Sequence, residues 1–282
     1  MNVEIKTIGV AGAGTMGSGI AQVFAQAGYT VSIYDQIPAM LQKAKSGIES
    51  NLAVLVSKTK ITEAEADSIL RRIGFTSDIE SVKADFIIEA IIENLKAKQE
   101  LFKELSTLNP ESILATNTST IPVTQIAFGV PHPERVIGVH FFNPAQIMKL
   151  VEIISGIETT DEIAQLVYNM IQKCGKSPIK AKDAPGFIVN RVARPFYTES
   201  QKLVEEQVAS VEDLDLLLES AGFKMGPFKL MDLIGNDVNF SVTKSLFEQF
   251  YYESRFRPSR IQEQLVSGGL LGRKSGRGFY KY

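Results

Sequence analysis

A glycine-rich turn near the start of the chain constrains the fold more than any other feature of the sequence. Gly12, Gly14 and Gly17 form a G-x-G-x-x-G element between an apolar run and a helix-like stretch, and Asp35 ends the next apolar run about 20 residues further on. In this pattern the first glycine permits a tight turn, the second lets the backbone approach a pyrophosphate, and the third lets helix and strand pack closely. The pattern therefore predicts a strand, turn and helix that bind a dinucleotide.

The acidic residue at the end of the second apolar run indicates which dinucleotide is bound. The carboxylate of Asp35 is placed to accept hydrogen bonds from both ribose hydroxyls, and it would repel a 2′-phosphate. The residues that follow it, Gln36 to Pro38, include no arginine that could neutralise such a phosphate. We therefore predict NAD rather than NADP as the cofactor.

Length and composition narrow the class of protein. A chain of 282 residues that is 44% hydrophobic is long enough for two domains. A net charge of −2 provides no attraction for nucleic acid, and a single cysteine with two histidines leaves no disulfide framework or structural zinc cluster. No apolar run approaches the roughly 20 residues of a membrane helix, and the first strand is expected to begin by about Glu4, which leaves no room for a leader. We expect a cytoplasmic protein that does not enter membranes.

Strand-like and helix-like runs alternate through the first two thirds of the chain. This alternation predicts a Rossmann-type α/β domain, with a mostly parallel sheet covered by helices on both faces. The run 149–153 follows its predecessor after a short Asn-Pro turn that is too brief for a crossover, so this pair should be antiparallel and lie at the sheet edge. The predicted strands are 7–11, 30–34, 86–90, 112–116, 135–139, 149–153 and 178–181.

The segment after the second predicted strand is too long for a simple connection. Helical spacing from Pro38 onward, and a capping box formed by Thr62 and Glu65, predict a helical hairpin that ends near Gly74. The first helix of this hairpin is expected to carry a set of lysines, which form either a solvated face or a cationic wall for an anionic part of the substrate. These lysines are Lys43, Lys45, Lys58 and Lys60.

The alternation stops at a Pro-Gly pair, and from there only helices are predicted. This change places a domain boundary near residue 184 and gives two domains, 1–184 and a smaller all-α domain over 185–282. The helical domain has a dense apolar and aromatic content, which leads us to expect a homodimer formed through it. The predicted helices are 187–208, 211–221, 228–234, 238–252 and 259–268.

Candidate chemical groups follow the strand ends, where open parallel sheets bind their ligands. Removing a hydride from a secondary alcohol requires a base for the hydroxyl proton, and histidine suits this role near neutral pH. His132 lies in a proline-bracketed loop, which favours a surface position, whereas His140 directly follows a predicted strand, on the ligand side. A lone acid on the adjoining strand, Glu152, needs a partner and could orient His140. From position alone, His140 could also be a structural histidine, and Glu152 could lie on a solvated face.

Sequence blocks along the whole chain resemble those of the 3-hydroxyacyl-CoA dehydrogenase family. These blocks are Gly-Ala-Gly-Thr-Met-Gly-Ser-Gly-Ile-Ala, Glu-Ala-Ile-Ile-Glu-Asn, Thr-Asn-Thr-Ser, His-Phe-Phe-Asn-Pro, Lys-Leu-Val-Glu-Ile, Pro-Gly-Phe-Ile-Val-Asn-Arg and Met-Gly-Pro-Phe, and they occur in the family's order and spacing. The length of the chain resembles that of the bacterial 3-hydroxybutyryl-CoA dehydrogenases in this family. The resemblance implies NAD-dependent interconversion of (S)-3-hydroxybutyryl-CoA and acetoacetyl-CoA.

The resemblance also assigns roles to individual residues. It implies that His140 is the general base, that Glu152 orients it, and that Ser119 and Asn190 hydrogen-bond the reacting oxygens, with Asn190 completing the site from the second domain as the domains close. For the CoA arm it implies Asn51 and Lys58, together with Ser119 and Asn190. No metal is implied. The implied cofactor contacts are Gly12, Ala13, Gly14, Thr15, Met16, Gly17, Asp35, Glu93, Lys98, Ser119, Asn143 and Lys274.

Two other functions stay open on the sequence. One is a dehydrogenase of a free hydroxy acid, similar to L-gulonate 3-dehydrogenase, which would reduce a free 3-keto acid in place of a CoA thioester. The other is a non-catalytic NAD-binding module, which would reduce neither compound. A spectrophotometric assay of NADH oxidation separates all three.

Overall fold

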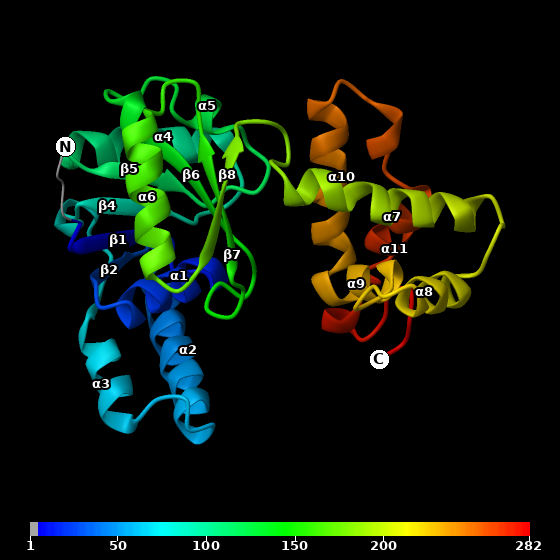
Figure 1. Cartoon of the computed structure of the whole chain (residues 1–282), viewed down its shortest axis with the longest axis horizontal. Coiled ribbons are helices and arrows are strands. Elements are labelled where there is room, and N and C mark those ends of the chain that lie inside the picture. The colour runs from blue at the N-terminus through cyan, green and yellow to red at the C-terminus, as the bar shows by residue number, and fades with distance from the viewer. Residues whose placement is uncertain (1–4) are drawn as a thin grey trace. The chain divides into compact units, whose positions relative to one another are not determined.

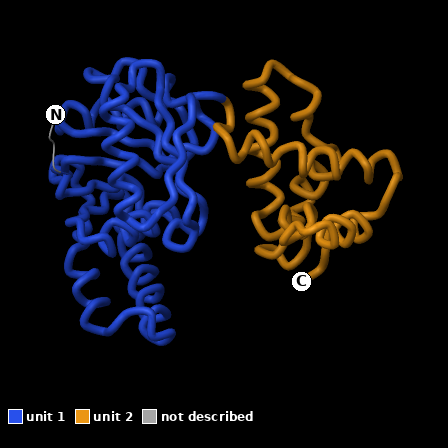
Figure 2. Tube along the Cα trace, viewed as in Figure 1, with its two compact units in different colours: residues 1–184 blue, residues 185–282 orange. Residues whose placement is uncertain are grey.

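A computed structural model describes residues 5–282 of the chain, and these residues form two compact units. The first unit extends to Ala184 and the second covers Pro185–Tyr282 (Figure 2). Glu4, where the sequence places the start of the first strand, lies outside the described residues. The first described strand begins at Thr7.

The first unit is built on one eight-stranded sheet with the order β3-β2-β1-β4-β5-β6-β7-β8 (Figure 1). All neighbouring pairs are parallel except β6 and β7, which are antiparallel, so the predicted mostly parallel sheet with one antiparallel pair is confirmed. The strands are β1 (Thr7–Ala11), β2 (Thr30–Tyr34), β3 (Ile73–Thr76), β4 (Phe86–Glu89), β5 (Ile113–Thr116), β6 (Val136–Phe141), β7 (Leu150–Ser155) and β8 (Ser177–Lys182). The helices are α1 (Thr15–Gln26), α2 (Pro38–Ser57), α3 (Glu63–Arg71), α4 (Leu95–Leu108), α5 (Val123–Ile126) and α6 (Asp161–Lys173), with short 3-10 helices at Ile79–Ser81 and Pro133–Arg135.

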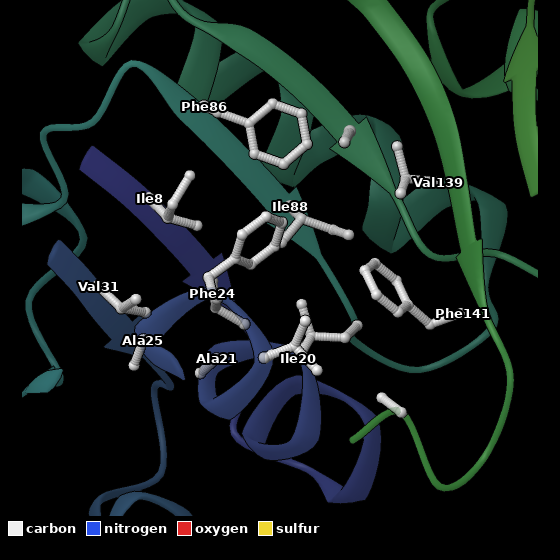
Figure 3. Packing of buried hydrophobic residues seen from close by; sticks show 14 of the residues in the cluster. Ile8, Ile20, Ala21, Phe24, Ala25, Val31, Phe86, Ile88, Val139 and Phe141 are labelled. Atoms are coloured by element: carbon white, nitrogen blue, oxygen red, sulfur yellow. The ribbon is translucent and has the colours of Figure 1, made fainter. Parts of the chain in front are cut away.

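The core of the first unit fixes α1 against the sheet. Phe24 of α1 is fully buried, and its ring centroid lies 5.9 Å from that of Phe86 on β4 and 6.3 Å from that of Phe141 on β6 (Figure 3). Burying one phenylalanine side chain contributes roughly 1.5–3 kcal/mol to stability. Residues of α6 belong to the same buried cluster, whereas Gly138 on β6 faces the other side of the sheet, toward Val123 of α5. Helices therefore cover both faces of the sheet, and the packing of Phe24 holds α1 in a fixed position directly after the glycine turn.

The helical insertion follows its predicted pattern and ends earlier than expected. Thr62 Oγ1 accepts the Glu65 N–H and the Glu65 carboxylate accepts the Thr62 N–H, so the predicted capping box at the start of α3 is confirmed. Figure 1 shows α2 and α3 extending together away from the sheet. Because α2 ends at Ser57, Lys58 and Lys60 follow the helix and do not lie on it, which corrects the expectation for these two lysines.

Two further details of the sheet differ from the prediction. The segment around Gly74 is not the end of a helix, because α3 stops at Arg71 and Ile73–Thr76 forms strand β3, parallel to β2. This strand has only four residues, one of them glycine, so its sequence shows little of the β-branched and aromatic pattern that is typical of strands. The antiparallel pair also does not lie at the edge, since β8 pairs in parallel with β7 and forms the outer strand.

The second unit is entirely helical apart from its last residues. Its helices are α7 (Val189–Glu205), α8 (Val211–Ser220), α9 (Pro227–Ile234), α10 (Asn236–Gln249) and α11 (Arg260–Ser267), with 3-10 helices at Ser254–Phe256 and Arg273–Ser275. Tyr197, Leu214, Phe228 and Met231 are buried together and form its core. Across residues 5–282, no helix combines the length and apolar character that crossing a bilayer requires.

Candidate active site

The glycine turn combines tight packing with one open backbone position. Gly12 has φ +107°, and a Cβ there would lie 2.6 Å from the carbonyl oxygen of Ala90. A Cβ on Gly17 would overlap the carbonyl oxygen of Gly12, so α1 approaches β1 more closely than any side chain allows. At Gly14, by contrast, a Cβ would meet no atom of another residue beyond its chain neighbours within 4 Å, among the residues that the structure describes. The backbone at Gly14 is therefore the position where a ligand is able to approach the turn.

The start of α1 suits an anionic ligand. Gly14 is its N-cap residue, and within the described chain no side chain caps the first turn and no acidic residue lies in it. The N–H groups and the partial positive charge of a helix N-terminus bind phosphate groups. The residues present thus fit the pyrophosphate of NAD, which the segment from Gly12 to Gly17 would hold.

Asp35, directly after β2, accepts a hydrogen bond from the backbone of the same turn. Its Oδ2 accepts the Ala13 N–H at 2.8 Å, and its Oδ1 accepts the Ile37 N–H at 2.9 Å. These bonds place a carboxylate directly beside the glycine turn, as recognition of a ribose requires. The contact of Asp35 with ribose hydroxyls stays a prediction.

His140 and Glu152 form a buried pair at the carboxyl end of β6. The two residues lie directly opposite each other in the antiparallel register of β6 and β7, and Nδ1 of His140 lies 2.7 Å from Oε2 of Glu152. The histidine side chain is 7% exposed and the glutamate side chain 1%, so water screens this pair little. The ring of Phe142 packs against the imidazole with centroids 4.5 Å apart. Glu152 therefore fixes the ring through Nδ1 and directs Nε2 to the opposite side.

A second carboxylate organises the loop that follows β5. Oε1 of Glu93 accepts hydrogen bonds from the Thr118 hydroxyl at 2.6 Å, from the Ser119 N–H at 2.9 Å and from the Thr120 N–H at 3.2 Å. Burial alone would raise the pKa of Glu93, but the Lys98 ammonium and the bonds from Thr118 and Ser119 outweigh it and hold this pKa below its usual value. Glu93 thus carries a negative charge that holds the half-buried Ser119 in place.

Lys98 is enclosed by the molecule. Its side chain is 1% exposed, and its Nζ lies 2.5 Å from Oε1 of Glu89 and 3.2 Å from Oε2 of Glu93. The resemblance implies a cofactor contact for Lys98, and the structure places its ammonium between two carboxylates. Glu89 is not among the residues predicted from the sequence, although its pattern resembles that of Glu152, since each is a lone acid in a largely apolar strand.

The other predicted residues of the first unit are Asn143, Asn51 and Lys58, and Asn190 and Lys274 belong to the second unit. Asn143 is exposed, two residues beyond the end of β6, and Asn51 on α2 donates a hydrogen bond to Oε1 of Gln22 at 3.2 Å. Lys58 is exposed directly after α2. In the second unit, Asn190 lies in the first turn of α7. Lys274 lies in the last 3-10 helix of the same unit, and its Nζ lies 2.7 Å from Oδ2 of Asp237.

The remaining chemistry-bearing residues of the described chain offer no second site of this kind. His132 is half-exposed and lies 3.2 Å from Glu134, in agreement with a surface position. No group of three or more His, Cys, Asp or Glu within residues 5–282 is arranged to hold a metal ion.

Comparisons with known proteins give a consistent result over the whole chain. Residues 7–184 match the model of the "3-hydroxyacyl-CoA dehydrogenase, NAD binding domain", and residues 186–282 match the "3-hydroxyacyl-CoA dehydrogenase, C-terminal domain". The chain is 46% identical to the 3-hydroxyadipyl-CoA dehydrogenase of Escherichia coli over 100% of its own length and 60% of that protein's. It is 43% identical to a probable 3-hydroxybutyryl-CoA dehydrogenase of Deinococcus radiodurans, over 97% of this chain and 99% of that one. The solved structure of (S)-3-hydroxybutyryl-CoA dehydrogenase from Ralstonia eutropha superposes with a TM-score of 0.95 at 38% identity and covers 99% of each chain.

Proposed function

This chain belongs to the 3-hydroxyacyl-CoA dehydrogenase family, and from that premise we propose that it interconverts (S)-3-hydroxybutyryl-CoA, or a closely related 3-hydroxyacyl-CoA, and its 3-keto form with NAD. The observation that carries the proposal is the buried contact of His140 with Glu152 at the carboxyl end of β6. It supplies an oriented base at the edge of the sheet where the glycine turn also lies.

Each side chain then has a defined part in the reaction. In the oxidation, Nε2 of His140 takes the proton of the substrate hydroxyl, and Glu152 stabilises the imidazolium that results. When bound, NAD supplies the ring carbon that receives the hydride, with its electron pair, from C3 of the substrate. In the reduction, the same imidazolium returns its proton to the oxygen of the 3-keto group. The hydroxyl of Ser119 is proposed to hydrogen-bond that oxygen, as is the amide of Asn190.

The test compares two substrates, a CoA thioester and a free 3-keto acid, and two variants, one at each histidine. NADH oxidation is followed with acetoacetyl-CoA and with the free 3-keto acid, and only the thioester should be turned over. His140→Gln should lower kcat by about 10²-fold or more, the scale of one positioned acid or base. His132→Gln is the matched control, because this histidine lies on the surface, and it should retain the activity of the parent enzyme. Equal activity of His140→Gln and the parent enzyme would refute the assignment.

The same assay defines the acyl group. Since the chain is 46% identical to a 3-hydroxyadipyl-CoA dehydrogenase, the panel should include thioesters whose acyl chain ends in a carboxylate beside those that end in a methyl group. The ratio of kcat/KM between the two series assigns the substrate class.

We further propose that the protein acts as a homodimer formed through its C-terminal helical unit, and that it works in the cytoplasm with CoA thioesters made there. Large apolar side chains on α8 support the dimer, since Leu216 and Leu217 are both 64% exposed. Light scattering should give twice the chain mass of 31.0 kDa. Replacing both leucines by glutamate should lower that mass toward one chain, and an unchanged dimer would exclude α8 from the interface.

A further inference from the structure

Glu89, the last residue of β4, is a completely buried carboxylate with three partners. Its Oε1 accepts the Lys98 ammonium at 2.5 Å and the Ile91 N–H at 2.7 Å, and its Oε2 accepts the Thr116 hydroxyl at 2.8 Å. The side chain is 0% exposed. A neutral glutamine would still accept the Ile91 N–H through its carbonyl oxygen, whereas its amide nitrogen could not accept the Thr116 hydroxyl. Only the ammonium of Lys98 requires a negative charge at this position.

Lys98 connects Glu89 with the loop that carries Ser119. Its Nζ also lies 3.2 Å from Oε2 of Glu93, while Oε1 of Glu93 accepts the Ser119 N–H at 2.9 Å. One ammonium is thus shared by two carboxylates. If Glu89 lost its charge, Lys98 would have Glu93 as its one ionic partner among residues 5–282 and would move toward it. That movement would draw Glu93 away from the N–H and hydroxyl groups of the loop.

The charges of Glu89, Lys98 and Glu93 depend on one another. Burial raises the pKa of Glu89, and the opposing effect of Lys98 and its hydrogen bonds compensates only in part. A charge left unpaired in such a buried site is strongly unfavourable, so the three side chains have to be considered as one unit.

We propose that Glu89 is a positioning residue for the dehydrogenase reaction, which holds Lys98 back from Glu93 and thereby keeps Glu93 in contact with the Ser119 loop. The inference rests on the proposed function in one respect, namely that Ser119 contacts the substrate. The proposed role of Glu89 is to maintain the geometry of the Ser119 loop, and Glu89 itself is not proposed to contact substrate or cofactor.

The test is a double-mutant cycle on kcat with acetoacetyl-CoA and NADH. Glu89→Gln should lower kcat about tenfold, in line with the large cost of small displacements near reacting atoms. In the Lys98→Met background the same change should lower kcat less than twofold, or raise it, because the residue through which Glu89 acts is absent. Coupling of this kind is expected only between residues that share one network. Equal losses in both backgrounds would overturn the proposal and leave Glu89 a general stabilising residue.

Asp85→Asn is the matched control. Asp85 immediately precedes β4, and its carboxylate accepts the N–H groups of Lys6 at 2.8 Å and Thr7 at 2.9 Å at the opposite end of the strand. This variant should unfold at a lower temperature with unchanged kcat, which separates loss of stability from loss of positioning. A lower kcat in Asp85→Asn that matches that of Glu89→Gln would also overturn the proposal.

Two further arms keep the outcome decisive. If Glu89→Gln does not fold, the cycle is run with Glu89→Asp, which keeps a carboxylate at this position but draws it back from Lys98 by one methylene. The smaller loss of kcat should again vanish in the Lys98→Met background. An unaltered enzyme that does not turn over acetoacetyl-CoA would refute the proposed function. An active enzyme without coupling between positions 89 and 98 would refute the positioning role alone.

Discussion

Replacing Glu152 by glutamine removes one negative charge from the buried pair while leaving a carbonyl oxygen able to accept from Nδ1 of His140. The side chains are 7% and 1% exposed, so the lost attraction acts in a poorly screened environment. Unit charges about 4 Å apart attract by about 4 kcal/mol at an effective dielectric constant of about 20. Since about 1.4 kcal/mol corresponds to a tenfold change in rate, a fully formed imidazolium would lose about 10³-fold in stabilisation. The proton is only partly transferred in the transition state, so we expect kcat to fall by about 10²-fold.

Three measurements distinguish this electrostatic role from a structural one. Steady-state kinetics should show the loss in kcat, whereas the affinity for NADH, measured by fluorescence titration, should stay within about threefold of that of the unaltered enzyme, because Glu152 acts on the proton donor. The unfolding temperature should be equal or higher, because removing a buried carboxylate relieves its desolvation cost. A kcat within about threefold of the original, or a loss that follows a lower unfolding temperature, would refute the reasoning.

Three other predictions follow from single positions. Gly14→Ala should weaken NADH binding by about tenfold without lowering the unfolding temperature, since the new Cβ would meet no neighbouring atom of the described residues within 4 Å. Gly17→Ala, by contrast, should destabilise the fold because its Cβ would overlap Gly12, and equal unfolding temperatures of the two variants would contradict this. Lys58→Ala should raise KM for the CoA thioester several-fold and leave KM for NADH unchanged, because Lys58 is exposed beside the helical insertion; an unchanged KM for the thioester would make Lys58 a solvated surface residue. Burial raises the pKa of the Cys174 thiol to about 12, so native protein should react with a thiol reagent near neutral pH far more slowly than unfolded protein does; similar rates would show that the thiol is accessible and ionised.

The parts of the fold that the sequence predicts are those encoded in local periodicity. Strands β1 and β2 agree with the predicted ranges at both ends, because a buried parallel strand is a continuous apolar run bounded by glycine or polar residues. The capping box at Thr62 and Glu65 is likewise a local pattern. The antiparallel pair of β6 and β7 was predictable because a connection through Asn143 and Pro144 is too short for a crossover.

The features that escaped prediction depend on contacts between distant segments. Strand β3 has four residues, and its place is set by the register of Ile73 with Val31, which no local pattern contains. The pairing of Lys98 with Glu89 and Glu93 depends on α4 bringing an ammonium back over the end of β4. A lysine on an amphipathic helix has the same local pattern whether it is solvated or enclosed, so only the packed structure distinguishes these environments.

The order of the strands explains why a few residue types, far apart in the sequence, make one candidate site. The glycine turn follows β1, Asp35 follows β2, Glu93 comes soon after β4, and Ser119 comes soon after β5. These strands are parallel, so their carboxyl ends share one edge, whereas β7 runs the opposite way and begins there. The reversal at β7 is what lets Glu152 stand directly opposite His140 near that edge. If β7 were parallel to β6, a crossover connection would have to join the two strands, and the acid would have to lie at the carboxyl end of β7 to reach the same edge. A short antiparallel return therefore places His140 and Glu152, the proposed base and the carboxylate proposed to orient it, twelve residues apart in the sequence and in direct contact.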